Sequence, residues 1–326
     1  NLLAVAGGRY FVFNGTMTLG ELTSFVMYLG QMIWPMLALA WMFNIVERGS
    51  AAYSRINALL NEQPAMIDGQ LSLMHQKGTL AVDIKAFHYP KQQVDVLKNI
   101  HFTLSPGEML GICGMTGAGK STLLALIQRL YDVSEGDIRF QSVPLYQLKL
   151  DEWRGRLAVV NQTPFLFSDT IAGNIALGRP DATKEEIEAV AKIANIHDDI
   201  LNLPEGYLTQ VGEKGVMLSG GQKQRISIAR ALLLDAEILL LDDALSAVDG
   251  QTEYQILQNL AQWRKEKTII ISAHRLSALV DATNILVLKQ GEIIEQGTHQ
   301  TLIAVPGWYQ DMYHYQQLEA ALDDDK

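Results

Sequence analysis

The longest apolar segment of the chain is residues 22–46, which contain no charged side chain between Glu21 and Glu47. A helix of about 25 residues is long enough to cross the hydrocarbon core of a bilayer, and a buried core helix of a soluble protein seldom stays uncharged over this length. Residues 22–46 therefore predict a transmembrane helix. Arg48 and Arg55 follow it closely, so we expect its carboxyl end to face the cytoplasm.

The segments on either side extend this picture. Residues 2–13 are also apolar and are expected to be the last part of a preceding span, joined to the next by a short external turn over residues 15–20. Residues 47–61 predict a helix that continues into the cytoplasm. Asn1 begins inside an apolar segment without an initiator Met, so we expect a piece of a longer, multi-pass protein. Residues 1–62 are predicted to form the end of an all-α transmembrane domain and its cytoplasmic extension.

After a Gln-, Pro- and Gly-containing linker predicted at 63–78, the pattern changes to short apolar runs that alternate with helical periodicity. This alternation is typical of an α/β fold with a mostly parallel sheet. The predicted parallel strands are 109–113, 158–160, 238–241, 268–272 and 285–288. Two further runs, 80–84 and 99–104, predict an antiparallel edge to that sheet, and helices are expected at 123–130, 183–196 and 223–234. The domain is predicted to span 79–318, followed by a polar tail, 319–326.

A glycine-rich loop follows the first parallel strand and precedes a helix, in the order G-x-x-x-x-G-K-S. Successive backbone N–H groups in such a loop point at phosphate oxygens, and the helix amino terminus adds positive potential. Lys120 is expected to reach the β- and γ-phosphates, Ser121 to bind Mg²⁺, and Thr122 to lie near the α-phosphate. The predicted phosphate-binding residues are Gly114, Met115, Thr116, Gly117, Ala118, Gly119, Lys120, Ser121 and Thr122.

Two further motifs indicate which class of nucleotide-binding protein the chain resembles. Leu218-Ser219-Gly220-Gly221-Gln222 opens a predicted helix, and its Ser hydroxyl and glycine amides form a second candidate anion site. An apolar strand then ends in Asp242-Asp243. These motifs, together with Gln162, residues 246–249 and His274, occur in an order and spacing that resembles an ABC transporter ATPase over residues 79–318.

The resemblance implies a RecA-like core, an inserted helical subdomain that begins near Gln162, and ATP and Mg²⁺ as cofactors. It implies catalytic roles for Asp243, His274 and Gln162, and metal binding by Ser121, Gln162 and Asp242. It also implies that Tyr89 stacks on adenine, although packing in the core is an alternative for Tyr89. The residues that would meet the nucleotide of a paired domain are Ser219, Gly220, Gly221, Gln222 and Asp249.

Asp243 departs from the family pattern, in which Glu usually follows the Mg²⁺-binding Asp. Its carboxylate lies one methylene short, about 1.5 Å, of the expected position of the general base. We therefore expect nucleotide binding to persist and hydrolysis at this site to be weak. In the family, two ATPase domains pair head to tail, and each nucleotide lies between one phosphate loop and the other domain's Ser219-type loop. A non-identical partner with Glu would supply one competent site, which favours a heterodimer over a homodimer.

Residues 34–48 and 242–249 are also similar to one half of the enterobacterial multidrug-resistance-like exporters. That similarity implies a bacterial inner membrane, a cytoplasmic ATPase domain, surrounding lipid, and export of xenobiotic or amphipathic compounds. A homodimeric lipid or peptide exporter and a nucleotide-gated regulatory subunit remain alternatives. The formal net charge of −10 argues against a nucleic-acid partner. The single cysteine, Cys113, lies in the strand before the phosphate loop and is expected to be a buried hydrophobic residue rather than a nucleophile.

Overall fold

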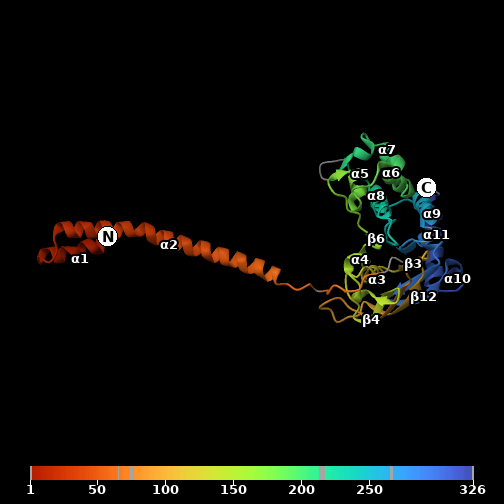
Figure 1. Cartoon of the computed structure of the whole chain (residues 1–326), viewed down its shortest axis with the longest axis horizontal. Helices are drawn as coiled ribbons and strands as arrows, with labels where there is room; N and C mark the ends of the chain where they lie inside the picture. Colours follow the sequence, from red (N-terminus) through yellow and green to blue (C-terminus); the bar gives the residue numbers. More distant parts are fainter. Residues whose placement is uncertain (1, 65, 74–76, 213–216, 265–266, 325–326) are drawn as a thin grey trace. The chain divides into compact units, whose positions relative to one another are not determined.

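The computed structural model describes residues 2–64, 66–73, 77–212, 217–264 and 267–324. The chain divides into two units, Asn1–Ala65 and Met66–Lys326, and each is described by itself. Figure 1 shows the first unit in red and orange as helices, and the second as a mixed helix and sheet domain.

The first unit consists of α1 (Leu2–Phe13) and α2 (Leu19–Leu60). Helix α2 contains both the predicted span and the predicted helix 47–61, and it is long and apolar enough to cross a membrane by length and composition. It begins earlier than expected, inside the predicted turn 15–20. Thr18 and Glu21 form a capping box, in which the Thr18 hydroxyl accepts from the Glu21 N–H at 3.3 Å and Glu21 accepts from the Thr18 N–H at 2.8 Å.

The second unit is built on a six-stranded sheet in the order β12-β11-β3-β10-β9-β6, in which every neighbouring pair except β11 and β12 is parallel. The predicted parallel strands are confirmed. Every residue of β3 and β10 is buried, as expected of parallel strands covered on both faces. The strands are β3 (Met109–Gly114), β6 (Leu157–Val160), β9 (Ile238–Asp242), β10 (Thr268–Ser272), β11 (Asn284–Lys289) and β12 (Glu292–Gly297).

The prediction that 80–84 and 99–104 form the edge of this sheet is wrong. They are β1 (Leu80–Phe87) and β2 (Leu97–Leu104), and they form a separate antiparallel sheet with β4 (Glu135–Phe140) and β5 (Val143–Pro144). Residues alternate between buried and more exposed positions along β1, and its apolar face shares one core with the phosphate-loop helix and one face of the parallel sheet. Strand β1 therefore packs face to face instead of continuing the ladder. The antiparallel edge of the main sheet is β12.

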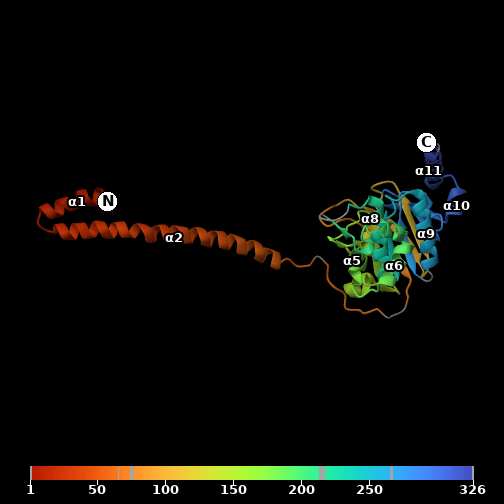
Figure 2. The same cartoon turned by 90° about the horizontal axis from the view of Figure 1, so that it is seen from above.

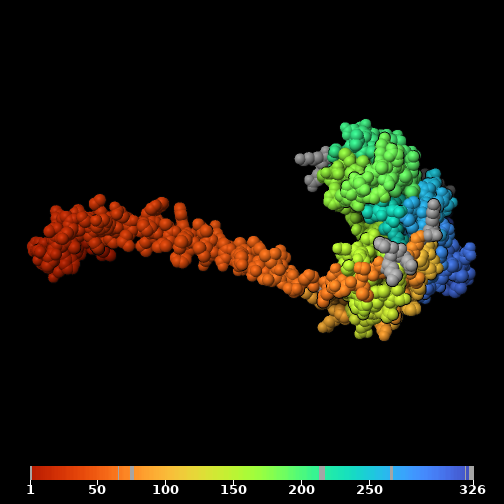
Figure 3. Space-filling model, viewed as in Figure 1, coloured from red at the N-terminus to blue at the C-terminus, as the bar shows by residue number. Residues whose placement is uncertain are grey.

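A helical subdomain follows β6, and Figures 1 and 2 show α5, α6 and α8 grouped there. In the space-filling view its residues, in green, form a lobe of their own on the domain (Figure 3). The predicted helix 183–196 ends early because Asn195 adopts a left-handed conformation with φ 53°. The subdomain contains α5 (Ile171–Ile175), α6 (Lys184–Ile193), α7 (His197–Leu201), α8 (Gly220–Leu233), and the short strands β7 (Asp169–Thr170) and β8 (Gln210–Val211).

Arg230 joins this subdomain to the segment that leaves the main sheet. Its guanidinium donates to the Asn174 carbonyl at 2.7 Å, to the Asn174 side chain at 3.1 Å and to the Phe165 carbonyl at 3.0 Å. The remaining helices of the domain are α3 (Lys120–Ile127), α4 (Leu150–Arg154), α9 (Gly250–Arg264), α10 (His299–Ile303) and α11 (Trp308–Asp324).

Candidate nucleotide-binding site

The loop between β3 and α3 has the backbone that the phosphate-binding motif requires. Gly114, Gly117 and Gly119 have φ of 141°, 80° and 104°, which L side chains rarely adopt. A Cβ at Gly119 would lie 2.6 Å from the end of the Leu97 side chain, which would have to shift, and the φ of 104° itself disfavours any larger residue there. Helix α3 begins directly after this glycine, at Lys120.

Lys120 lies under this loop and is 7% exposed. Its ammonium donates to the carbonyls of Gly114 at 2.8 Å and Met115 at 3.1 Å. Burial lowers the pKa of Lys120, while the nearby charges of Asp243 and Asp242 act in the opposite direction. The cation is thus held by two neutral carbonyls and can exchange them for anionic phosphate oxygens.

Residues from the carboxyl ends of three strands, β6, β9 and β10, meet the loop around a cavity of about 260 Å³. Because the carboxyl ends of parallel strands share one edge of the sheet, residues distant in sequence converge there. The lining residues are Val96, Thr116, Gly117, Ala118, Gly119, Lys120, Ser121, Thr122, Gln162, Asp242, Asp243, Ser272 and His274. The structure therefore brings together all of the residues predicted to bind metal and all of those predicted to be catalytic.

Asp243 is held in place from two sides. Its N–H donates to the Ser272 carbonyl at 2.8 Å, and its side chain accepts from the Gln162 amide at 3.2 Å. Its φ of 48° is left-handed, a conformation that Asp tolerates better than most residues. The carboxylate, 9% exposed, is thus fixed beside Gln162 at the end of β9.

The donor set in this cavity fits Mg²⁺, which prefers oxygen ligands and keeps several waters when it binds with nucleotide phosphates. A hydroxyl (Ser121), an amide oxygen (Gln162) and a carboxylate (Asp242) line the same space. Among the described residues, no group of three or more His, Cys, Asp or Glu side chains is placed to hold a metal by itself. The site therefore suits a cation that arrives with its nucleotide.

Tyr89 lies beside the loop rather than in the cavity lining. Its hydroxyl is 2.9 Å from the Thr122 hydroxyl, and its ring packs edge to face on Phe87 and Tyr131, with centroids 5.3 and 5.1 Å away. Stacking of this ring on adenine stays a prediction.

Residues 219–222 and Asp249 do not line the cavity either. The Ser219 hydroxyl caps α8 by accepting from the Gln222 N–H at 3.2 Å, and Asp249 accepts from the Thr252 N–H at 2.9 Å. The two motifs instead contact each other: a Cβ at Gly221 would lie 2.8 Å from the Ala247 carbonyl oxygen. Ser219 and Asp249 are both exposed, so a second molecule can reach them.

Glu253, which the sequence motifs did not predict, does not line the cavity but links two loops that carry predicted site residues. It is 3% exposed, and it accepts from the Arg275 guanidinium at 3.1 Å and from the Ser277 hydroxyl at 2.7 Å. Arg275 also donates to the Val248 carbonyl at 2.7 Å. This network joins the loop that carries Asp249 to the residue after His274. Nothing in the spacing predicts it, because it depends on how α9 packs on the sheet.

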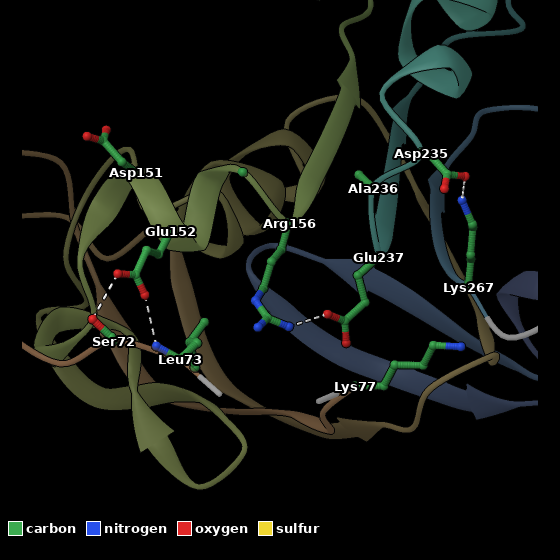
Figure 4. Close-up of a pocket in the computed structure, with 11 residues that line it drawn as sticks. Ser72, Leu73, Lys77, Asp151, Glu152, Arg156, Asp235, Ala236, Glu237 and Lys267 are labelled. Atoms are coloured by element: carbon green, nitrogen blue, oxygen red, sulfur yellow. Dashed lines mark hydrogen bonds and ion pairs between the residues drawn. The ribbon is translucent and has the colours of Figure 1, made fainter. Parts of the chain in front are cut away.

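A separate cavity of about 820 Å³ lies at the opposite, amino-terminal ends of β9 and β10 (Figure 4). Arg156 pairs with Glu237 at 2.5 Å, Lys267 pairs with Asp235, and Glu152 accepts from the Ser72 hydroxyl at 2.8 Å and the Leu73 N–H at 2.9 Å. None of the predicted site residues is among the described residues that line it. The two hydrogen bonds to Glu152 attach the segment after residue 66 to the domain. The cavity beside them is distinct from the nucleotide site.

Cys113 precedes the phosphate loop, and its burial raises the pKa of the thiol to about 12. The thiolate is the reactive form, so we expect no alkylation of the native protein by iodoacetamide at pH 8 and complete alkylation after denaturation. Mass spectrometry of the tryptic peptide measures both. Rapid labelling of the native protein would show that the β3 strand opens to solvent.

Comparison with known proteins agrees with this geometry. The family described as ABC transporter matches residues 97–246. The chain is 67% identical to the multidrug resistance-like ATP-binding protein MdlA of Escherichia coli, over 99% of the chain and 55% of that protein. It is 46% identical to the probable multidrug resistance ABC transporter ATP-binding/permease protein YheI of Bacillus subtilis, over 98% of the chain and 55% of that protein.

A solved bacterial Atm1-family ABC exporter with ATP bound superposes with a TM-score of 0.81 at 36% identity, covering 97% of this chain and 56% of the exporter chain. The chain thus spans about half the length of the relatives it matches. The motifs that resemble ABC ATPases lie on the expected strand ends, and both sequence and structure match members of one family. The chain therefore contains the ATP-binding domain of an ABC transporter.

Proposed function

We propose that this chain is the ATP-binding and membrane-anchoring part of an exporter that couples ATP binding and hydrolysis to the export of xenobiotic or amphipathic compounds. The observation that carries the proposal is the convergence of Lys120, Gln162, Asp242 and His274 on one cavity, in a chain that also contains a helix able to cross a membrane. The multidrug-resistance names of the relatives support the substrate class. A bacterial inner membrane, with the ATPase domain in the cytoplasm, follows from the same reasoning.

In this proposal, some of the residues bind the phosphates and Mg²⁺, and others orient the attacking water for hydrolysis. The amides of the loop and the Lys120 ammonium would hold the phosphates, and Ser121, Gln162 and Asp242 would hold Mg²⁺, which supplies charge neutralisation at the phosphates. Asp243 would orient the attacking water, and His274 would contact the γ-phosphate. Because Gln162 donates to Asp243 and also begins the helical subdomain, a change at the γ-phosphate would move that subdomain.

The exposed motifs that contain Ser219 and Asp249 imply a partner, a second half of an ABC transporter. Ser219 and Asp249 do not line the cavity of their own chain, so they are free to complete a nucleotide site on a partner. The short carboxylate of Asp243 favours a non-identical partner that carries Glu, with most hydrolysis at the partner's phosphate loop. A homodimeric lipid or peptide exporter and a nucleotide-gated regulatory subunit are the alternative functions.

Replacing Asp243 with Asn is expected to lower ATP turnover of the assembled complex by less than about threefold, because a retracted base contributes little of the roughly hundredfold or more that general bases supply. Asn also tolerates the left-handed backbone and can keep the contact with Gln162. Asp243→Glu, which restores the missing methylene, is expected to raise turnover. A hundredfold fall in Asp243→Asn would identify Asp243 as a working base and end the asymmetric proposal.

The decisive test of the whole assignment is purification of the tagged full-length protein from its membrane, with mass spectrometry of what accompanies it. A stoichiometric second ABC half with Glu after its Mg²⁺-binding Asp is the expected result. A pure homodimer would contradict the heterodimer. Failure of the reconstituted complex to accumulate amphipathic dyes in vesicles with ATP would favour the regulatory alternative.

A further inference from the structure

Ser272 is a polar residue in the nucleotide cavity that the proposed function leaves without a role. It is the last residue of β10, it is fully buried at 0% exposure, and its hydroxyl has no hydrogen-bond partner among the residues that the structure describes. A buried hydroxyl without a partner is uncommon in folded proteins and costs free energy, and it marks a place where water or a ligand is expected. The three residues before it, Ile269–Ile271, are all isoleucine, and the other hydroxyl of the strand, that of Thr268, accepts a hydrogen bond from the Gly107 N–H.

The sheet register places this hydroxyl beside the predicted metal ligand. Ser272 pairs with Asp242 on the neighbouring parallel strand β9. Side chains alternate along both strands, and Leu240 and Ile270, two residues earlier, lie in the same core as the phosphate-loop helix. Ser272 and Asp242 therefore face the same side of the sheet, under the phosphate loop. Paired strands lie about 4.8 Å apart, a separation at which one water can bridge two side-chain oxygens.

Both residues line the cavity that contains Lys120 and Ser121. A cation held there by Ser121, Gln162 and one carboxylate oxygen of Asp242 would keep several waters, and these waters need acceptors and donors in fixed positions. Asp242 supplies an acceptor. The Ser272 hydroxyl supplies a donor and an acceptor at the adjacent strand position.

We propose that Ser272 is a positioning residue for the Mg²⁺ site, and that its hydroxyl, together with Asp242, holds a water of the cation's hydration shell. The inference rests on the proposed function, because it requires that the cavity bind Mg²⁺ with ATP. Ser272 does not touch the nucleotide in this arrangement. It determines how tightly the cation is held once the nucleotide is bound.

The test measures the metal rather than turnover. Full-length protein in detergent micelles is titrated with Mn²⁺ in the presence of a non-hydrolysable ATP analogue, and bound Mn²⁺ is followed by electron paramagnetic resonance. Ser272→Ala is expected to weaken Mn²⁺ binding about tenfold, as loss of an outer-shell partner does at other metal sites, and to leave metal-free analogue binding unchanged. Ser272→Thr, which keeps a hydroxyl, is expected to retain the wild-type affinity for Mn²⁺.

Thr268→Val is the matched control, because it removes a buried hydroxyl from the other end of the same strand. The Thr268 hydroxyl accepts from the Gly107 N–H at 3.3 Å, so this change is expected to lower Tm without changing Mn²⁺ affinity. Ser272→Ala breaks no hydrogen bond within the described part of the chain and is expected to leave Tm unchanged or higher. A lower Tm in Ser272→Ala, with unchanged Mn²⁺ affinity, would mean that the hydroxyl is structural.

The outcomes separate this inference from the proposed function. If wild-type protein binds Mn²⁺ with the analogue and Ser272→Ala binds it equally well, the role of Ser272 is refuted and the ATPase assignment stands. If wild-type protein binds neither the analogue nor Mn²⁺, the proposed function itself fails.

Discussion

Replacing Lys120 with Ala is expected to weaken ATP binding by about two to four orders of magnitude. The ammonium can form charge-assisted hydrogen bonds to two phosphates, each about 1.5–3 kcal/mol, and about 1.4 kcal/mol corresponds to a tenfold change in affinity. The same ammonium donates to the carbonyls of Gly114 and Met115 in the structure. The cation is therefore already in place, and little ordering is needed when phosphate arrives.

A fluorescent ATP analogue titrated into the full-length protein measures this effect. Lys85→Ala is the matched control, because Lys85 is an exposed lysine of β1 that is not among the residues lining the cavity, and its loss is expected to leave affinity unchanged. The β3 strand and its glycines are untouched in both variants. Binding by Lys120→Ala within threefold of wild type would show that the cavity around residues 116–122 is not the nucleotide site.

The sequence predicted the parallel sheet well because its strands are buried on both faces. Residues 109–113 are apolar throughout, and residues 268–272 contain three consecutive isoleucines; no amphipathic helix has that pattern. Strand β12, Glu292–Gly297, was not predicted, because no residue on it is fully buried and its sequence mixes Glu and Gln with Ile. Strand β4 starts with the exposed residues Glu135 and Gly136, and its two buried residues, Ile138 and Phe140, are too few to indicate a strand.

The two sheets could not be separated from sequence because pairing depends on tertiary packing. Strand β1 has the alternation of a half-buried antiparallel strand, which is equally compatible with the edge of a large sheet and with a sheet of its own. Strand β1 belongs to a separate sheet because Leu80, Val82 and Ile84 pack in one core with the phosphate-loop helix. That contact joins residues about 40 positions apart and leaves no local signal.

In the candidate site, too, some residues could be predicted from the sequence and some contacts could not. The order and spacing of its motif residues were enough to predict that they meet, and the phosphate loop, Gln162, Asp242, Asp243 and His274 line one cavity in the structure. The contact between Gln162 and Asp243 spans 81 residues, and the network around Glu253 depends on how α9 packs. Only one feature of the sequence indicated Ser272, a hydroxyl at the end of an isoleucine-rich strand two residues before His274. The structure pairs Ser272 with Asp242 on β9, and this position is what suggests a role for the hydroxyl.

Replacing Ser219 with Arg is expected to abolish nearly all ATP hydrolysis by the assembled complex while leaving ATP binding at this chain's own loop intact. Ser219 is exposed and opens α8, and it is not among the residues lining the cavity around Lys120. A long, charged side chain at this position would occupy the space in which a partner's nucleotide meets the helix amino terminus. In the proposed heterodimer that nucleotide lies at the more active site, so one substitution on this chain would stop the partner's chemistry.

Ser219→Ala is the control that distinguishes the effect of blocking this surface from the effect of losing the helix cap. Both variants lose the hydroxyl that accepts from the Gln222 N–H, a change that costs about 1 kcal/mol of stability. Only the Arg variant adds bulk, so Ser219→Ala is expected to keep most of the turnover. Turnover is measured by phosphate release, and binding by the fluorescent analogue used for Lys120. Normal turnover in Ser219→Arg would mean that this loop does not complete a site on another chain, and the exposed positions of Ser219 and Asp249 would then need a different explanation.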